Sequence, residues 1–127
     1  MTAKKAITTD KAPAALGPYS QAVQTGNSLY ISGQLGINPA AGKIVNGGIT
    51  AQARQALLNV EAILTAGGFS KEEVVQVQIF LTDMPAFRAV NDIYTQFFSE
   101  PFPARAVTEV SALPAGGLIE ITAIAVK

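Results

Sequence analysis

The chain has 127 residues, of which 49% are hydrophobic and 14% charged, and its 9 lysines and arginines balance 9 aspartates and glutamates. It contains neither cysteine nor histidine, which excludes disulfides, thiol nucleophiles, Ser-His-Asp triads and metal sites built on His or Cys. A chain of this size and composition predicts one ordered domain, residues 1–127. Zero net charge argues against nucleic acid as the main partner, because phosphate binding relies on excess positive charge.

The N-terminal part of the sequence predicts three strands and an irregular connection. Residues 4–9 form a short β-prone run, which a segment rich in Pro and Gly follows. Two further β-prone runs within residues 21–34 flank Gly26-Asn27, a pair typical of a hairpin turn. Residues 35–48 are rich in Gly, Pro and Asn and predict an irregular excursion. The start of the chain has no apolar signal core, and no stretch reaches membrane-spanning length, so we expect a soluble, cytoplasmic protein.

Two amphipathic helices are predicted further along the chain. The first covers about residues 50–66, with Thr50 as its N-cap and Gly67-Gly68 as its left-handed stop. The second covers about residues 85–98. Its apolar side chains recur at helical spacing and predict a buried stripe of Phe87, Val90, Tyr94 and Phe97.

The remaining segments predict strands. Residues 74–83 alternate, which places Val75, Val77, Ile79 and Leu81 on one face. The last two runs, RAVTEVSAL at 105–113 and LIEITAIAV at 118–126, are joined by PAGG, and we expect them to pair as a hairpin. The order β-β-β-α-β-α-β-β predicts an α+β fold with two helices on one face of a mixed sheet. The other face then needs cover, and its residues suit association with sister subunits.

Two charged side chains interrupt the apolar C-terminal runs. Arg105 opens the first run, and Glu120 lies inside the second. Charged side chains are seldom fully buried unless they are paired. The pattern therefore has two interpretations, namely a structural ion pair of Arg105 with Glu109 or Glu120, or a functional site. Arg105 begins one strand of the expected hairpin and Glu120 lies near the start of its partner, so their separation suits side chains on neighbouring strands if the two share a face.

Four motifs, GPYSQA at 17–22, SGQ at 32–34, PAR at 103–105 and IEI at 119–121, occur together in the chain. With them the sequence resembles the RidA/YjgF family of imine deaminases over nearly its whole length. The resemblance implies a fold similar to chorismate mutase and a homotrimer with a pocket between neighbouring subunits. It also implies hydrolysis of 2-imino acids, such as 2-iminobutanoate and 2-iminopropanoate released by pyridoxal-phosphate dehydratases, to 2-oxo acids and ammonia. Neither a cofactor nor a metal is expected.

The resemblance carries five site residues onto this sequence. The essential arginine of the family corresponds to Arg105, whose planar guanidinium can donate two parallel hydrogen bonds to the substrate carboxylate. The acidic residue is Glu120, expected to orient water and transfer protons from a partly dry cleft. Tyr19 and Ser32 are expected to hydrogen-bond the imine nitrogen, the water or the carboxylate, and Asn91 to brace the cleft. The last three also have structural interpretations, as a packed ring, a strand end and a helix-surface amide.

Val107 stands where many members of the family carry a cysteine, so thiol-dependent behaviour is not expected. Two other functions remain open from the sequence. One is a regulatory module that binds a small carboxylate without turning it over. The other is an endoribonuclease or translation inhibitor, activities also attached to this family, which the neutral charge disfavours.

Overall fold

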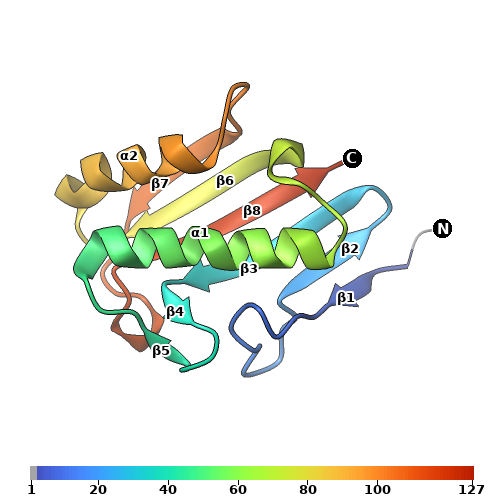
Figure 1. Cartoon of the computed structure of the whole chain (residues 1–127), viewed down its shortest axis with the longest axis horizontal. Helices are drawn as coiled ribbons and strands as arrows, with labels where there is room; N and C mark the ends of the chain where they lie inside the picture. The colour runs from blue at the N-terminus through green and yellow to red at the C-terminus, as the bar shows by residue number, and fades with distance from the viewer. Residues whose placement is uncertain (1–2) are drawn as a thin grey trace.

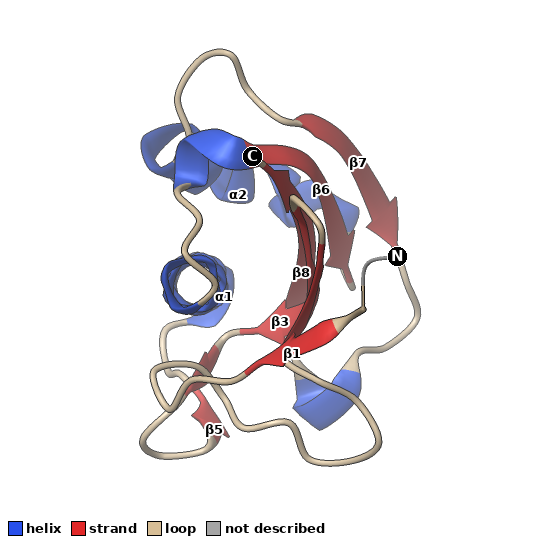
Figure 2. Ribbon diagram, turned by 90° about the vertical axis from the view of Figure 1, so that its right-hand side faces the viewer, coloured by secondary structure: helices blue, strands red, loops and turns tan. Residues whose placement is uncertain are grey.

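A computed structural model describes residues 3–127. Residues 1 and 2 lie outside the described part. They belong to the N-terminal segment in which the sequence shows no apolar signal core. Six strands form one mixed sheet, and two helices cover one of its faces (Figures 1 and 2), which confirms the predicted α+β class. Within residues 3–127, none of the helices has the length and apolar character that crossing a membrane requires.

The sheet has the order β1-β2-β3-β8-β6-β7. Its strands are β1 (Lys5–Ile7), β2 (Ala22–Thr25), β3 (Ser28–Leu35), β6 (Val74–Leu81), β7 (Ala104–Glu109) and β8 (Ile119–Val126), and the helices are α1 (Gly48–Ala66) and α2 (Phe87–Phe97). The β2–β3 hairpin turns at Gly26-Asn27, as predicted. The excursion predicted as irregular contains a two-stranded ribbon of β4 (Ile37–Asn38) and β5 (Lys43–Ile44).

Glycines define both ends of α1. Its N-cap is Gly47, with φ 114° and no side-chain cap, so Thr50 lies in the first turn and the predicted Thr50 cap is wrong. The left-handed turn at Gly47 itself brings the chain into the helix. At the other end Gly68 has φ 80°, and the Phe69 N–H donates to the Leu64 carbonyl over 2.8 Å. This bond ends the helix with a Schellman motif, which confirms the stop predicted at the glycine pair.

The second helix is shorter than predicted. A 3₁₀ turn at Met84–Ala86 precedes α2, so Pro85 lies before the helix proper. The buried side chains of α2 are Val90, Ile93 and Tyr94. Phe87 and Phe97 are only partly buried, which corrects the predicted stripe at its two ends.

Strand β6 contains an irregularity that the alternation did not reveal. Its pairing with β8 shifts register between Val74 and Gln76. Val74 is consequently buried, whereas Val75 is 46% exposed. Val77, Ile79 and Leu81 face the core as predicted, but the placement of Val75 with them is wrong.

The two C-terminal strands do not form the predicted hairpin. β7 pairs in parallel with β6, and β8 lies between β3 and β6 (Figure 1). Every second residue of β8 is buried and most of the others are partly covered, which suits a central strand. β7 is mostly exposed and occupies the sheet edge. Arg105 and Glu120 are therefore not on neighbouring strands, because β6 separates them.

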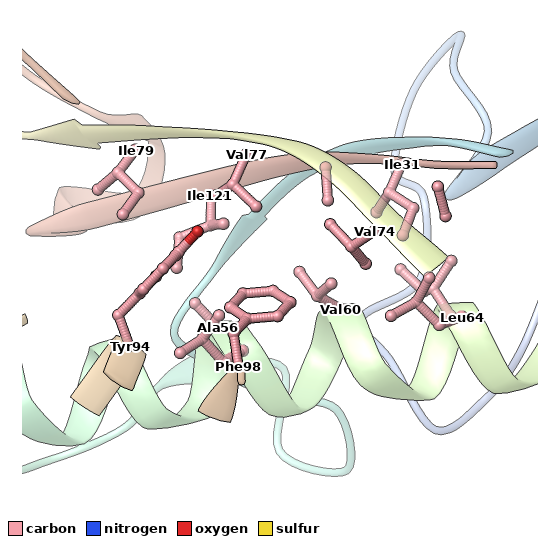
Figure 3. Packing of buried hydrophobic residues seen from close by; sticks show 14 of the residues in the cluster. Ile31, Ala56, Val60, Leu64, Val74, Val77, Ile79, Tyr94, Phe98 and Ile121 are labelled. Atoms are coloured by element: carbon pink, nitrogen blue, oxygen red, sulfur yellow. The ribbon is translucent and has the colours of Figure 1, made fainter. Parts of the chain in front are cut away.

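The core lies between the sheet and the helices (Figure 3). From α1 it takes Ala56, Val60 and Leu64; from the sheet Ile31, Val74, Val77, Ile79 and Ile121; and from the second helical region Tyr94 and Phe98. The ring of Tyr94 extends toward the sheet, and the side chain is only 4% exposed. Its hydroxyl is buried and has no hydrogen-bond partner among the described residues.

We expect Tyr94→Phe to leave the free energy of unfolding unchanged or to raise it. The substitution keeps the ring and removes a buried hydroxyl whose lack of a partner costs about 1–3 kcal/mol. Chemical denaturation measures this change, with Tyr94→Leu as a comparison that also removes the ring. A loss of stability larger than about 1 kcal/mol in Tyr94→Phe would contradict the absence of a partner.

Candidate functional site

Arg105 lies at the start of β7, beside α2. It pairs with Val77, whose side chain is buried beneath the helices, so Arg105 faces the same side of the sheet. Its Nη1 donates a hydrogen bond to Oδ1 of Asn91 over 2.8 Å. The guanidinium carbon is 4.6 Å from the ring centroid of Tyr94 and 5.0 Å from that of Phe87. An amide and two aromatic faces thus hold the guanidinium by hydrogen bonding and cation–π attraction.

The guanidinium has no carboxylate partner in the described part of the chain, where the ion pair found is Lys71–Glu61. The carboxylate of Glu109 instead accepts a hydrogen bond from the Met84 N–H over 2.7 Å. The ion-pair interpretation of Arg105 is therefore wrong for the single chain. The Arg105 side chain is exposed and borders a hollow of about 400 Å³. Its unused N–H groups can bind an anion there.

Glu120 faces the opposite side of the sheet. Its neighbours in β8, Ile119 and Ile121, are buried on the helix side, so Glu120 points to the face that no helix covers (Figure 2). The side chain is partly buried, and burial raises the pKa of its carboxyl group. Desolvation disfavours the charged form of an acid, which makes such a group a better proton carrier near neutral pH.

A β-bulge brings the backbone of β3 against Glu120. The pairing of β3 with β8 shifts register between Ile31 and Gln34, so Ser32 and Gly33 lie in the bulge. A Cβ atom added to Gly33 would be 2.6 Å from Cδ of Glu120. Only glycine leaves room for the carboxyl group in this position, which explains the need for the small residue in the SGQ motif.

The remaining two candidates lie near this bulge. Oγ of Ser32 donates to the Ser20 carbonyl, and the Ser32 N–H donates to the Gln21 carbonyl over 3.0 Å. These bonds fasten the segment that carries Tyr19 to β3. Tyr19 is 54% exposed and borders a second hollow, which Gly33 also lines.

The structure thus divides the five predicted residues into two groups. Arg105 and Asn91 are together beside α2, which we name the arginine group. Glu120, Ser32 and Tyr19 belong to the region of the β3 bulge, which we name the glutamate group. The two groups lie on opposite sides of the sheet and do not meet within one chain. Three further residues contribute to these groups without being predicted as site residues: Gly33, which lies against Glu120, and Phe87 and Tyr94, which the helical spacing places in the core alone.

The fold and these two groups define a small α+β domain with a partly desolvated carboxyl group and a guanidinium that pairs with no carboxylate in the described residues. The sequence profile of the family described as Endoribonuclease L-PSP matches residues 9–127. The chain belongs to this family, the RidA/YjgF family that its motifs resemble.

Curated relatives match nearly the whole chain. The 2-iminobutanoate/2-iminopropanoate deaminase of Capra hircus is 52% identical over 98% of this chain and 90% of its own. The human protein of the same name is 48% identical with the same coverage.

Solved structures agree in fold. RidA from the Antarctic bacterium Psychrobacter is 47% identical, with a TM-score of 0.94 over 97% of this chain and 99% of its own. E. coli TdcF with bound serine is 40% identical, with a TM-score of 0.92 over 97% of this chain and 98% of its own.

We expect Glu120→Gln to raise the melting temperature at neutral pH. The folded-state pKa of Glu120 is raised above its unfolded value. Its contribution to stability is therefore complete below the unfolded pKa, about 4.3, and is lost as pH rises through the folded pKa. Glutamine does not ionise, so Glu120→Gln avoids this loss of stability at neutral pH. The difference in melting temperature between the variant and the wild type should therefore disappear in acid. Thermal denaturation between pH 3 and pH 7 measures the difference, and an advantage independent of pH would refute the role of desolvation.

Proposed function

We propose that this cytoplasmic protein hydrolyses 2-imino acids, including 2-iminobutanoate and 2-iminopropanoate, to 2-oxo acids and ammonia. The single observation that carries the proposal is the guanidinium of Arg105, which is oriented by an amide and two rings yet has no carboxylate partner among residues 3–127. Such a group suits a small acid with one carboxylate. The deaminase names of curated relatives at about half identity support the same reaction.

We infer that the working site forms between two copies of the chain. The arginine group and the glutamate group lie on opposite sides of one sheet, so the arginine group of one subunit must meet the glutamate group of the next. A contact between two different surfaces of the same chain closes into a ring when its rotation permits. The resemblance to the family supplies three as the number of subunits. The sheet face without helices supplies surface for such an assembly.

Arg105 binds the substrate in this mechanism. Its fork donates two parallel hydrogen bonds to the carboxylate, while the Nη1 bond to Asn91 fixes the plane of the guanidinium. Phe87 and Tyr94 limit the swing of the side chain. The carboxylate is thereby held with the adjacent C=N carbon facing the neighbouring subunit, and positioning of this kind contributes much of the acceleration.

Glu120 of the neighbouring subunit performs the proton transfers. Its carboxylate takes a proton from water as the water oxygen bonds to the C=N carbon, and the C=N π electrons pass to nitrogen. Glu120 then returns the proton to nitrogen. The hydroxyl group of the resulting carbinolamine then gives its proton, through Glu120, to the amino nitrogen. The C–N bond breaks as a C=O bond forms, and the nitrogen leaves as ammonia. The raised pKa of Glu120 suits both directions of transfer. Tyr19 contributes a hydrogen bond from the rim, and Ser32 holds that rim to β3.

Arg105→Ala should remove imine hydrolysis beyond the spontaneous rate, because the carboxylate loses its anchor. A coupled assay in which threonine dehydratase generates the imine measures this, with Arg54→Ala, an exposed arginine on α1, as the matched control. Arg105→Lys keeps the positive charge but cannot donate two parallel hydrogen bonds from one planar group. Its rate of imine hydrolysis should therefore lie between those of Arg105→Ala and Arg54→Ala. Catalysis unchanged in Arg105→Ala would overturn the assignment.

The same assay separates an enzyme from a module that only binds. Glu120→Gln should still bind pyruvate, since Arg105 is intact, while turnover is lost. Calorimetry supplies the binding constant. If turnover survives in this variant, Glu120 is not the proton carrier.

Mixing inactive subunits should restore activity. Trimers assembled from equal amounts of refolded Arg105→Ala and Glu120→Gln chains contain interfaces at which both groups are intact. Random assembly makes about a quarter of the interfaces complete, because each of the two subunits supplies its intact group half of the time. Recovery near that fraction of wild-type activity is expected, whereas no recovery would place both groups in one subunit.

A further inference from the structure

Glu120 lies close to the end of the sheet. It is the second residue of β8, and its pair with Leu35 is the last pair of the β3–β8 ladder. On the other side of β8, the ladder with β6 ends at Ile119 and Leu81. Before Ile119 the backbone therefore has no strand partner in the sheet that residues 3–127 form. Strand ends of this kind open more readily than strand centres, unless other contacts hold them.

A buried amide of α1 supplies such a contact. Oε1 of Gln52, a buried side chain, accepts a hydrogen bond from the Leu118 N–H over 2.9 Å. The Leu118 carbonyl accepts a second bond, from the Thr82 N–H over 3.3 Å. Leu118 lies two residues before Glu120 and outside the strand, yet hydrogen bonds hold its backbone on both sides.

A second amide, about two turns further along the same face of α1, holds the partner strand. Nδ2 of Asn59, also buried, donates to the carbonyls of Leu35 and Ile37 over 3.1 and 3.0 Å. Its Oδ1 accepts from Nε2 of Gln55 over 2.9 Å, so the amide is itself fixed. Because Leu35 is the register partner of Glu120, the two amides of α1 act on both strands of this last pair.

The helix and the strand end are in direct contact. A Cβ atom added to Gly36, the residue after Leu35, would be 2.6 Å from Cα of Gln52. No side chain therefore fits between the backbone of α1 and the backbone that follows β3. At this short range a glutamine or asparagine side chain reaches the strand backbone without a bridging group.

The position of the strand end decides how deeply the Glu120 carboxyl group is buried. On the face without helices, the register partners of Glu120 are Leu35 on β3 and Phe80 on β6, and neither carries a charge. Gly33 lies against the carboxyl group itself. Burial raises the pKa of Glu120. A shift of the strand end away from Gly33 would admit water and bring that pKa back toward the ordinary value.

We propose that Gln52 and Asn59 are positioning residues for Glu120. From the helix side of the sheet, their amides fix the backbone at the end of the β3–β8 pair and so keep the carboxyl group against Gly33, where it takes a proton from water. Neither amide touches the substrate. Their effect on the rate rests on the deaminase activity proposed above.

The test replaces Gln52 by methionine and by glutamate. Methionine has a similar length but offers the Leu118 N–H only a weak acceptor, whereas glutamate keeps an oxygen there. Leu118 is 37% exposed, so water can replace the lost acceptor and Gln52→Met should fold. Ile63→Val, at a fully buried position further along α1, is the matched control, because it loosens the core without touching the strand end.

In the coupled assay, kcat of Gln52→Met should fall roughly tenfold, because a displaced catalytic group loses its alignment with the substrate. The affinity for pyruvate should be unchanged, since Arg105 is intact. Gln52→Glu should recover most of the rate, and Asn59→Ala should lower kcat as Gln52→Met does. An equal fall in Ile63→Val would indicate a general loss of packing and would overturn the positioning role.

A titration of the Glu120 carboxyl group does not depend on turnover. Carbon NMR follows its pKa, with the signal assigned by its absence in Glu120→Gln. The pKa should fall toward the ordinary value in Gln52→Met and stay raised in Gln52→Glu and Ile63→Val. A pKa in Gln52→Met equal to that of the wild type would overturn the positioning role, whatever the rates. If the wild type hydrolyses no imine, the deaminase is refuted, and the titration alone decides the role of the two amides.

Discussion

Strand β6 separates the two strands that carry the charged side chains, and the proposed chemistry depends on that separation. β7 pairs in parallel with one edge of β6, while β8 pairs antiparallel with the other. Arg105 consequently faces the helix-bearing side, and Glu120 faces the side without helices. A salt bridge between them within the chain would have neutralised both groups. Their separation leaves the two charged groups of the described chain unpaired with each other, as the proposed binding of substrate between two copies requires.

The local surroundings equip each group for a different task. Arg105 is fixed from two directions by neutral partners, the Asn91 amide and the Tyr94 and Phe87 rings, so its charge stays available while its motion is restricted. Glu120 lies against the backbone of Gly33 and loses part of its hydration, which raises its pKa. An anion anchor benefits from permanent charge, whereas a proton carrier benefits from a pKa closer to neutral.

Sequence patterns predicted well wherever neighbouring residues decide the structure. Gly26-Asn27 makes the hairpin turn, and Gly68 ends α1, because each acts through its own backbone conformation. The patterns failed where distant segments compete for partners. The PAGG connection suggested a hairpin, yet β7 is too exposed for the sheet interior and pairs with β6 at the edge.

In the candidate site, too, local patterns predicted individual residues, whereas contacts between distant segments could not be predicted. The isolated charges and family motifs identified Arg105 and Glu120, but their grouping followed from strand order, which no local pattern contained. Gly33 escaped notice because its importance is a close approach to a residue 87 positions away, 33 to 120. Helical spacing predicts that Tyr94 lies in the core, and the structure confirms this, but the Tyr94 ring also faces the guanidinium.

A crystal structure of the protein with pyruvate bound tests the central claim most directly. We predict the pyruvate carboxylate on the Arg105 fork of one subunit and its C2 atom facing Glu120 of another. Pyruvate held by both residues of a single chain, or placed away from Arg105 altogether, would contradict the account.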